Sequence, residues 1–131
     1  MSARVIVGAA IVRGGALLAQ QRAYPPDVAG LWELPGGRVE TGETEPEALR
    51  RECVEELGVE VLVGERVGVD VPLRANLVLR VYAAELADPT AEPKPLEHKG
   101  LRWIRPDALD RVRWLPADLE LLPHLRSLLA A

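Results

Sequence analysis

The sequence predicts a protein of the mixed α/β (α+β) class, in which a mixed β-sheet lies between α-helices. Three observations support this: strand-like apolar segments recur along the chain, a strongly capped helical pattern interrupts them, and a leucine-rich helical pattern follows near the C-terminus. The strands and helices do not alternate as regular βαβ units, so we expect a mixed sheet. With 131 residues, the chain can form one domain with a real core but not two, and we expect a single domain over 1–131.

The N-terminal segment predicts a β-hairpin. Residues 5–12 are apolar and partly β-branched, Arg13-Gly14-Gly15 interrupts them, and residues 16–21 resume the apolar pattern. Two apolar runs around a glycine turn are typical of two paired strands. A short extended piece is expected at 31–34, ended by Pro35-Gly36-Gly37.

Local signals define a helix between Thr44 and Gly58. Thr44 is a favourable N-cap, and Glu47 three residues later completes a capping box. Pro46 falls in the first turn, where its missing N–H costs nothing. Gly58 suits the position just after the helix. An apolar stripe repeats every four residues along this helix: Leu49, Cys53 and Leu57.

The remaining elements are predicted from shorter patterns. We expect loops at 24–27 and 88–95, a strand or bent pair of strands at 59–71, further strands at 77–86 and 101–104, a helical turn at 106–109 and a terminal helix at 119–129. Pro123 lies inside that last segment, so it either kinks the helix or marks its true start.

Composition excludes several functions. The formal net charge of −4 argues against binding a nucleic-acid polymer, which relies on clustered positive charge. The single cysteine, Cys53, rules out an internal disulfide and a thiolate zinc site. The apolar N-terminal stretch is too short to span a membrane and lacks the pattern of a cleaved signal, so we expect a cytoplasmic protein.

Three glutamates of the predicted helix carry the chemical signal. Glu52, Glu55 and Glu56 stand at i, i+3 and i+4 and therefore share one face, next to the apolar stripe. Carboxylates this close resist ionising together, and a hard divalent cation such as Mg²⁺ would remove the conflict. The alternative is a solvated acidic face, because charge runs usually lie at the surface.

The context of these glutamates resembles a family signature. From Gly37 the sequence runs five residues to Glu43, seven more to Arg51-Glu52, then Cys53, any residue, Glu55-Glu56, any residue and Gly58. This is similar to the signature of the Nudix hydrolase superfamily at each defined polar and glycine position. Cys53 is the one departure, because a larger aliphatic residue usually fills that slot.

The flanking segments resemble the MutT-like subgroup of small nucleotide pyrophosphohydrolases. They are the segments 30–35, GLWELP, and 114–118, WLPAD. The resemblance implies the Nudix fold, a mixed sheet sandwiched between helices with the motif as loop–helix–loop. It also implies hydrolysis of a nucleoside triphosphate to the monophosphate and pyrophosphate, by attack of water at the β phosphorus. The role implied is nucleotide-pool sanitation, which protects DNA.

The resemblance assigns roles residue by residue. It implies a Mg²⁺ site, in which Mn²⁺ can substitute, with these ligands: Glu52, Glu55, Glu56, the carbonyl of Gly36 and, in the loop before residues 101–104, Glu97. Arg51 is expected to orient the glutamates through ion pairs, which its fixed fork of donors suits; an ordinary i,i+4 pair with Glu55 is compatible with that role. The candidates for the catalytic base are Glu52, which we favour, Glu43 and Glu97.

Substrate recognition is expected from four further positions: Arg22 on the phosphates, and Glu33, Leu34 and Asp118 around the nucleoside. Asp118 stands where the resemblance places an asparagine in proteins that read oxidised guanine. An ionised aspartate only accepts hydrogen bonds, which favours a donor edge such as the amine of cytosine. The candidate substrates are therefore 8-oxo-dGTP and dCTP, CTP or 5-methyl-dCTP. In the alternative interpretation, Asp118 only caps the C-terminal helix.

Other interpretations stay open at this point. We expect Trp32, His98 and His124 to be packing or surface residues. A Nudix hydrolase of another substrate, such as ADP-ribose or a dinucleoside polyphosphate, is a second enzyme hypothesis. A non-catalytic nucleotide sensor is a third, although a sensor has no need of Glu52, Glu55 and Glu56 together. The expected partner is a nucleotide, with no membrane or nucleic-acid polymer, and the chain is expected to be a monomer or homodimer.

Overall fold

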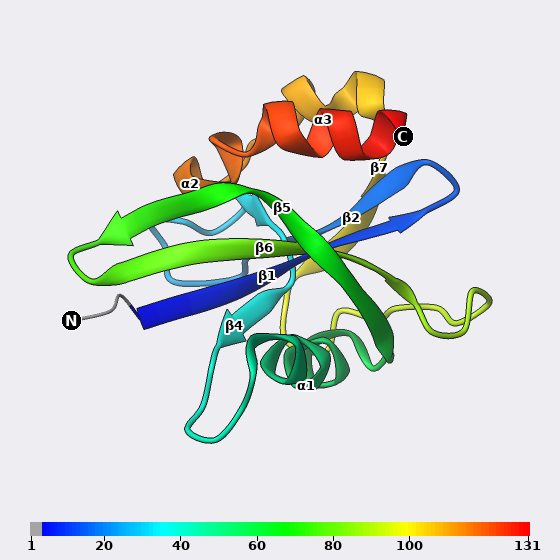
Figure 1. Ribbon diagram of the computed structural model, residues 1–131. Helices are drawn as coiled ribbons and strands as arrows, with labels where there is room; N and C mark the ends of the chain where they lie inside the picture. Colours follow the sequence, from blue (N-terminus) through cyan, green and yellow to red (C-terminus); the bar gives the residue numbers. More distant parts are fainter. Residues whose placement is uncertain (1–3) are drawn as a thin grey trace.

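The computed structural model describes residues 4–131. Over this range it forms a seven-stranded sheet, with helix α1 on one face and helices α2 and α3 on the other (Figure 1). The elements in chain order are β1 (Arg4–Arg13), β2 (Ala16–Gln21), β3 (Trp32–Glu33), β4 (Gly36–Arg38), α1 (Glu45–Leu57), β5 (Val61–Arg74), β6 (Leu77–Leu86), β7 (Gly100–Ile104), the 3₁₀-helix η1 (Pro106–Arg111), α2 (Pro116–Leu119) and α3 (Leu122–Ala130). This confirms the predicted α+β class.

Strand β1 organises the sheet. It pairs in parallel with β6, from Arg4 opposite Leu77 to Ile11 opposite Ala84. It pairs antiparallel with β2 at one end and with β4 at the other, and β2 in turn pairs with β3 and β7. The sheet is therefore mixed, as the irregular order of strands and helices predicts.

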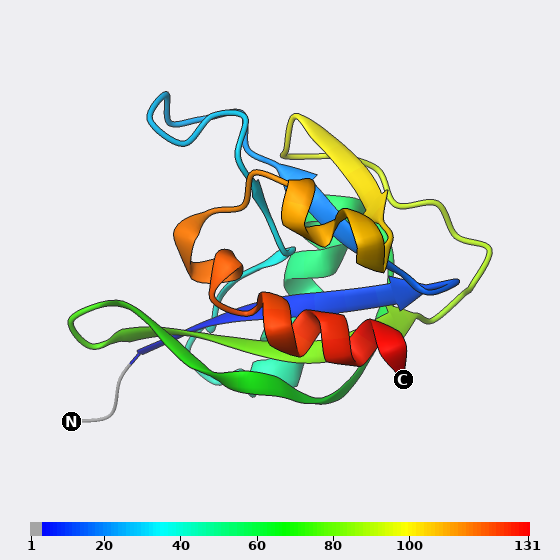
Figure 2. The same cartoon turned by 90° about the horizontal axis from the view of Figure 1, so that it is seen from above.

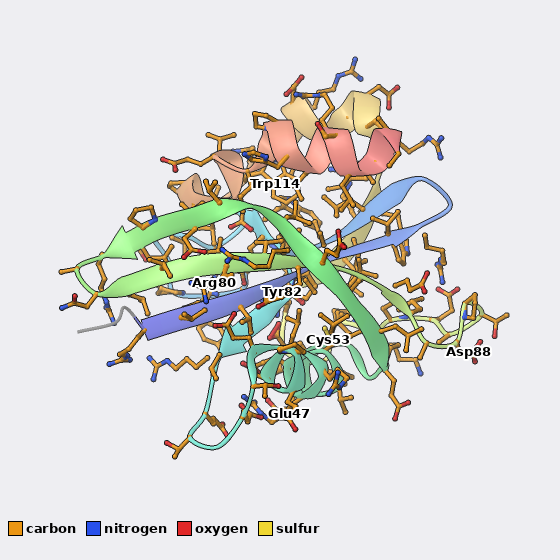
Figure 3. The ribbon with its side chains drawn as sticks, viewed as in Figure 1. Glu47, Cys53, Arg80, Tyr82, Asp88 and Trp114 are labelled. Atoms are coloured by element: carbon orange, nitrogen blue, oxygen red, sulfur yellow. The ribbon has the colours of Figure 1, made fainter. Side chains whose placement is uncertain are left out.

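The sheet separates two apolar clusters. On one face, the stripe of α1 packs into a cluster with strand residues, and Cys53 lies on the side of the helix that faces the sheet (Figure 3). On the other face, Trp114 packs with Leu121 and Leu125 beneath the C-terminal helices. Figure 2 shows α3 lying along the sheet on the face opposite α1. Each face of the sheet thus has its own cover.

Helix α1 has the predicted ends. The Thr44 hydroxyl accepts from the Glu47 amide at 3.2 Å, and the Glu47 carboxylate accepts from the Thr44 amide at 2.8 Å. Gly58 ends the helix at φ 69°, a left-handed conformation that glycine adopts without strain. The capping box and the glycine stop are confirmed.

The start of α1 is also tied to the sheet. The carboxylate of Glu45 accepts from Arg80 Nη1 and from the Tyr82 hydroxyl, both at 2.6 Å. Arg80 also donates to Asp70 on β5. Arg80 and Tyr82 lie on the stretch of β6 that passes above α1 in Figure 3. These contacts fix the direction in which α1 presents its remaining side chains.

The structure differs from the prediction in two places. Gly36-Gly37 does not end an extended segment: it forms β4, which pairs with Ile6, Val7 and Gly8 of β1. Near the C-terminus, a separate short helix α2 precedes α3, and Pro123 lies in the first turn of α3. Pro123 thus marks the true start of the terminal helix. Of the predicted segment 59–71, residues 61–71 belong to the single irregular strand β5, which has register shifts against β6.

Candidate active site

Helix α1 presents the three glutamates of the i, i+3, i+4 pattern to different surroundings. Glu56 is only 4% exposed, and the side chain of Glu52 is 14% exposed. The side chain of Glu55 is 49% exposed and faces solvent. The apolar stripe that docks the helix carries Glu52 and Glu56 inward with it, because residues three and four apart share a face. Two of the three carboxylates are therefore taken out of water.

Glu56 is held by two donors on the same oxygen. Gln20 Nε2 donates to Oε1 at 2.5 Å, and the Gly36 amide donates to the same atom at 3.4 Å. Gln20 is fully buried on β2, and its own Oε1 has no partner among residues 4–131. Burial raises the pKa of Glu56 to about 7 even though these donors oppose the shift. The Oε2 oxygen receives no hydrogen bond from the described residues.

The second inward carboxylate, Glu52, also has a raised pKa. Burial, and then the charge of Glu56, raises its pKa to about 7. A buried pair of this kind suits a cation, which would stabilise both ionised forms. Among the residues that the structure describes, no three Asp, Glu, His or Cys side chains are grouped to hold a metal ion as they stand. Glu52 and Glu56 still fit a hard divalent ion, since both carboxylates face inward and such ions prefer oxygen ligands.

Two glycines let β4 pass close to this pair. A Cβ at Gly37 would overlap the carboxylate of Glu52, and a Cβ at Gly36 would overlap the carbonyl oxygen of Val7. Strand β4 therefore fits between β1 and the glutamates only without side chains at these two positions. This explains why Gly36-Gly37 occurs in a strand, although the sequence alone predicts that these residues end the preceding extended segment.

Arg51 gathers the outer carboxylates. Its Nε and Nη2 donate to Glu43 at 2.7 and 3.0 Å, and its Nη2 also donates to the Arg38 carbonyl at 2.9 Å. Its Nη1 lies 3.3 Å from Glu55 and 3.5 Å from Glu52. The hydrogen bonds from Arg51 lower the pKa of Glu43. Glu43 is thereby committed to Arg51 and makes a poor proton acceptor.

The inward carboxylates open into a cavity of about 230 Å³, which we call the carboxylate cavity. Its lining residues are Arg22, Ala23, Tyr24, Glu33, Gly36, Glu52, Glu56, Glu97 and His98. Glu97 is exposed at its rim. The carboxylate cavity is therefore lined by several carboxylates and by one arginine, Arg22.

Glu33 is the point at which several groups meet. Its Oε2 accepts from Arg22 Nη1 at 3.1 Å and lies 2.8 Å from His98 Nε2. The expectation that His98 is a surface or packing residue is wrong, because its ring lines the carboxylate cavity. Nothing in the local sequence separates it from a solvated loop histidine. Only the pairing of β2 with β3 and β7 brings these segments together.

A second, larger space adjoins the first. This apolar cavity, of about 450 Å³, is lined by Ile6, Glu33, Pro72, Leu73, Leu79, Leu115, Pro116, Ala117, Asp118 and Glu120. Aliphatic walls with a few converging polar groups are typical of small-molecule sites. Glu33 lines both cavities, so one carboxylate stands between a polar space and an apolar one.

Asp118 is buried at the edge of the apolar cavity. It is 5% exposed, and its Oδ2 accepts from the Leu34 amide at 3.0 Å. The interpretation that it caps the C-terminal helix is wrong, since α3 begins after Leu121 without a side-chain cap. Burial raises the pKa of Asp118 to about 7. At neutral pH it is therefore both an acceptor and, when protonated, a donor.

The predicted site residues do not all lie at the cavities. The side chain of Leu34 belongs to the core beneath the C-terminal helices. Leu34 is linked to the site by the hydrogen bond that its backbone amide donates to Asp118. Trp32 packs against the same core, as expected. Gln20 was missed. The alternation of side chains along β2 places Leu18 and Gln20 on the same face of the strand, which is the only sequence signal for Gln20. Only the structure shows that α1 covers that face.

Comparison with known proteins gives consistent results. The NUDIX domain family model matches residues 2–125. The "Putative 8-oxo-dGTP diphosphatase 2" of Mycobacterium tuberculosis is 48% identical over 118 residues, covering 88% of this chain and 82% of that protein. The CTP pyrophosphohydrolase of Escherichia coli is 37% identical, covering 96% and 93%. The solution structure of the E. coli ORF135 protein superposes with a TM-score of 0.82 at 36% identity, covering 98% and 91%. Over residues 4–131, none of the helices has the length and apolar character needed to cross a membrane.

Proposed function

The chain belongs to the NUDIX family, and from this premise we propose that it hydrolyses nucleoside triphosphates to monophosphates and pyrophosphate. One observation carries the proposal. A cavity with two buried carboxylates, Glu52 and Glu56, adjoins an apolar cavity, and Glu33 lines both. A nucleotide has the same division, with a charged polyphosphate at one end and a flat base at the other. We therefore assign the phosphates to the carboxylate cavity and the base to the apolar cavity.

Nudix hydrolases generally use a divalent metal ion. We propose Mg²⁺, with Mn²⁺ as a substitute, held by Glu52, Glu55 and Glu56 with the Gly36 carbonyl and Glu97 as further ligands. Such an ion neutralises phosphate charge and makes a bound water more acidic. Glu55 bonds to Arg51 across the solvent face of α1, so it must turn from that contact to join the other two.

The residues of the chain supply positioning and proton transfer. We propose that Arg22 binds the phosphates at the mouth of the carboxylate cavity, while Arg51 keeps the outer glutamates in place. Glu52 is our candidate for the base that takes a proton from the attacking water, because its side chain lines the carboxylate cavity. Glu43 fits this role less well, since Arg51 lowers its pKa. Glu97 is exposed at the rim and is the second candidate.

We propose two classes of base for the apolar cavity. The relatives are named for 8-oxo-dGTP and for CTP, and either would make the protein an enzyme of nucleotide-pool sanitation. The polar side chains of the cavity are all acidic: Glu33, Asp118 and Glu120. Such groups favour bases with exposed donors, such as the amine of cytosine or the amine and ring N–H groups of 8-oxoguanine.

Hydrolysis in the presence of Mg²⁺ tests the proposal, measured as pyrophosphate release from dCTP, CTP, 5-methyl-dCTP, dGTP and 8-oxo-dGTP and as AMP release from ADP-ribose. We expect turnover of the triphosphates, with the highest kcat/KM for 8-oxo-dGTP or for one of the cytosine nucleotides. Turnover of ADP-ribose alone would contradict the assignment to triphosphates. Binding without hydrolysis in Mg²⁺ and in Mn²⁺ would contradict a catalytic role.

We further propose that residues 1–131 act as one domain. The family model spans most of this range, and both apolar clusters pack on the same sheet. Because the proposed substrates are free nucleotides, the activity belongs in the cytoplasm. Size-exclusion chromatography with light scattering will distinguish a monomer from a homodimer.

Asp118→Asn is expected to change both base preference and stability. The folded pKa of Asp118 is raised to about 7, so the stability it contributes is present at low pH and is lost as pH rises through 7. Asparagine can still accept from the Leu34 amide but does not ionise. The variant should therefore be more stable than wild type at about pH 8, on the order of 1.4 kcal/mol for each unit of the shift. The difference should be smaller at about pH 5 and vanish below the ordinary aspartate pKa of 3.8.

Urea unfolding at both pH values measures this difference, and kcat/KM across the same nucleotides measures the preference. We expect the preferred base to change while hydrolysis is retained, because Asp118 lies away from the carboxylate cavity. An unchanged substrate profile together with a pH-independent stability difference would remove Asp118 from base recognition.

A further inference from the structure

Two side chains hold the carboxylate of Glu33, which lines both cavities. One of its oxygens, Oε2, accepts from Arg22 Nη1 at 3.1 Å and contacts His98 Nε2 at 2.8 Å. Because Arg22 donates to this oxygen, the oxygen acts as an acceptor, and the His98 nitrogen must carry the hydrogen. No hydrogen bond to the other oxygen, Oε1, is found within residues 4–131. One oxygen is thus fully engaged and the other is left available.

The backbones on both sides of this contact are fixed by the sheet. Glu33 pairs with Gln20 across β2 and β3, and the amide of Lys99, next to His98, donates to the Gln21 carbonyl at 2.8 Å. The ring of His98 is itself 12% exposed. His98 and Glu33, 65 positions apart, are therefore presented to each other by the loop that leads into β7 and by β3, which lie on either side of β2.

The position of Glu33 identifies what its free oxygen meets. If the phosphates occupy the carboxylate cavity and the base occupies the apolar one, the sugar must cross the boundary between them. Glu33 lines both cavities and is therefore at that boundary. The hydroxyl groups of a sugar donate hydrogen bonds, and a carboxylate oxygen is a strong acceptor for them.

We propose that His98 is a positioning residue: together with Arg22 it fixes the Glu33 carboxylate at the junction of the two cavities, so that the free oxygen accepts a hydrogen bond from the sugar of the nucleotide. This inference rests on the proposed function, because it takes the site to hold a nucleotide. It makes His98 a determinant of nucleoside affinity, acting through Glu33, and not of the chemical step.

Binding to non-hydrolysable analogues tests the proposal directly. We would measure the Kd of α,β-methylene-CTP and of its 2′-deoxy and 2′,3′-dideoxy forms by titration calorimetry with Mg²⁺, for wild type, His98→Gln and His98→Asn. The amide nitrogen of glutamine can reach the position of Nε2, whereas that of asparagine corresponds to Nδ1. His124→Gln, at the exposed histidine of α3, is the matched control.

His98→Asn should weaken binding of the 2′-deoxy analogue about tenfold, a typical effect of losing a hydrogen bond to a charged group. His98→Gln should restore most of this affinity, and His124→Gln should match wild type. Removing the remaining sugar hydroxyl should weaken binding to wild type but add little to the loss in His98→Asn, because both changes disrupt the same contact. With dCTP as substrate, the His98→Asn effect should appear in KM while kcat changes little.

Several results would overturn the inference. Equal losses in the asparagine and glutamine variants would indicate a general structural role for His98. A structural role would also be indicated if His98→Asn lowered the melting temperature and weakened the binding of all three analogues equally. A ratio of dideoxy to deoxy affinity in His98→Asn equal to that of wild type would argue against the sugar contact. Absence of analogue binding to wild type would overturn this inference, while hydrolysis of 8-oxo-dGTP would still support the proposed function. If wild type binds the analogues but hydrolyses none of the nucleoside triphosphates, the proposed function fails and the binding ratios still decide the role of His98.

Discussion

Glu56→Gln is expected to lower turnover of the nucleotide by about a thousandfold or more, since loss of metal charge stabilisation is worth several kcal/mol and each factor of ten corresponds to about 1.4 kcal/mol. Glu56 is the most buried of the three glutamates, and two donors hold one of its oxygens in place. A glutamine retains the shape and the acceptor oxygen for those donors. What it removes is the negative charge that we assign to the metal ion.

The same variant should leave the metal-free protein folded and more stable at high pH. Burial raises the pKa of Glu56 to about 7, well above its ordinary range. A group shifted in this direction contributes stability that is present at low pH and lost as pH rises through the folded pKa. Since glutamine does not ionise, the gain in unfolding free energy over wild type should be small near pH 5 and larger above pH 7.

Unfolding by urea in EDTA and steady-state kinetics in Mg²⁺ measure the two effects separately. Glu55→Gln should also reduce turnover by orders of magnitude, with little change in stability because its side chain is half exposed. Glu60→Gln, at an exposed glutamate just beyond α1, is the control and should behave as wild type. Wild-type turnover in either Glu55→Gln or Glu56→Gln would contradict the metal assignment.

Replacing each of the two glycines of β4 by alanine should have a different effect, on stability at Gly36 and on activity at Gly37. At Gly36 the new Cβ would overlap the backbone carbonyl of Val7 in the buried part of β1. Backbone cannot move aside without breaking the pairing of β4 with β1, so Gly36→Ala should destabilise the fold by about 2–4 kcal/mol. At Gly37 the new Cβ would overlap the carboxylate of Glu52, which is the movable end of a side chain.

Gly37→Ala should therefore fold with nearly wild-type stability and lose activity, because Glu52 must leave its place in the carboxylate cavity. Urea unfolding, kcat/KM and Mn²⁺ affinity by electron paramagnetic resonance distinguish the two variants. Gly64→Ala on β5 is the control, since its nearest neighbour beyond the adjoining residues, the Ala83 carbonyl oxygen, lies at 3.4 Å. Normal activity in Gly37→Ala would argue against the role assigned to Glu52.

The helix that carries the glutamates could be read from the sequence because its signals are local. Thr44, Glu47 and Gly58 lie within a turn of the ends they define, and the structure shows each in its expected cap. The i, i+3, i+4 spacing likewise follows from helical geometry alone. Strand β4 could not be read in this way. Its glycines favour a turn by local preference, and the strand exists because it pairs with β1, whose matching residues lie about thirty positions earlier.

The immediate surroundings of the glutamates depended on contacts between distant segments. Gln20 reaches Glu56 across 36 positions, His98 reaches Glu33 across 65 and the Leu34 amide reaches Asp118 across 84. No local pattern along the chain indicates that these particular residues contact one another. Burial is also a property of the whole fold, and it is burial that raises the pKa of Glu52, Glu56 and Asp118.

The sequence by itself determined the capped helix and the shared face of its three glutamates, because neighbouring residues encode these through helical spacing and capping. Its resemblance to a known signature indicated the family, and the order of its apolar segments indicated the class of fold. Only the tertiary structure decided that Glu52 and Glu56 face inward while Glu55 faces solvent. Only it decided that Glu33 stands between two cavities. The reason is that side chains brought together by sheet pairing and packing change one another's exposure and charge, and no pattern along the chain records which of them will meet.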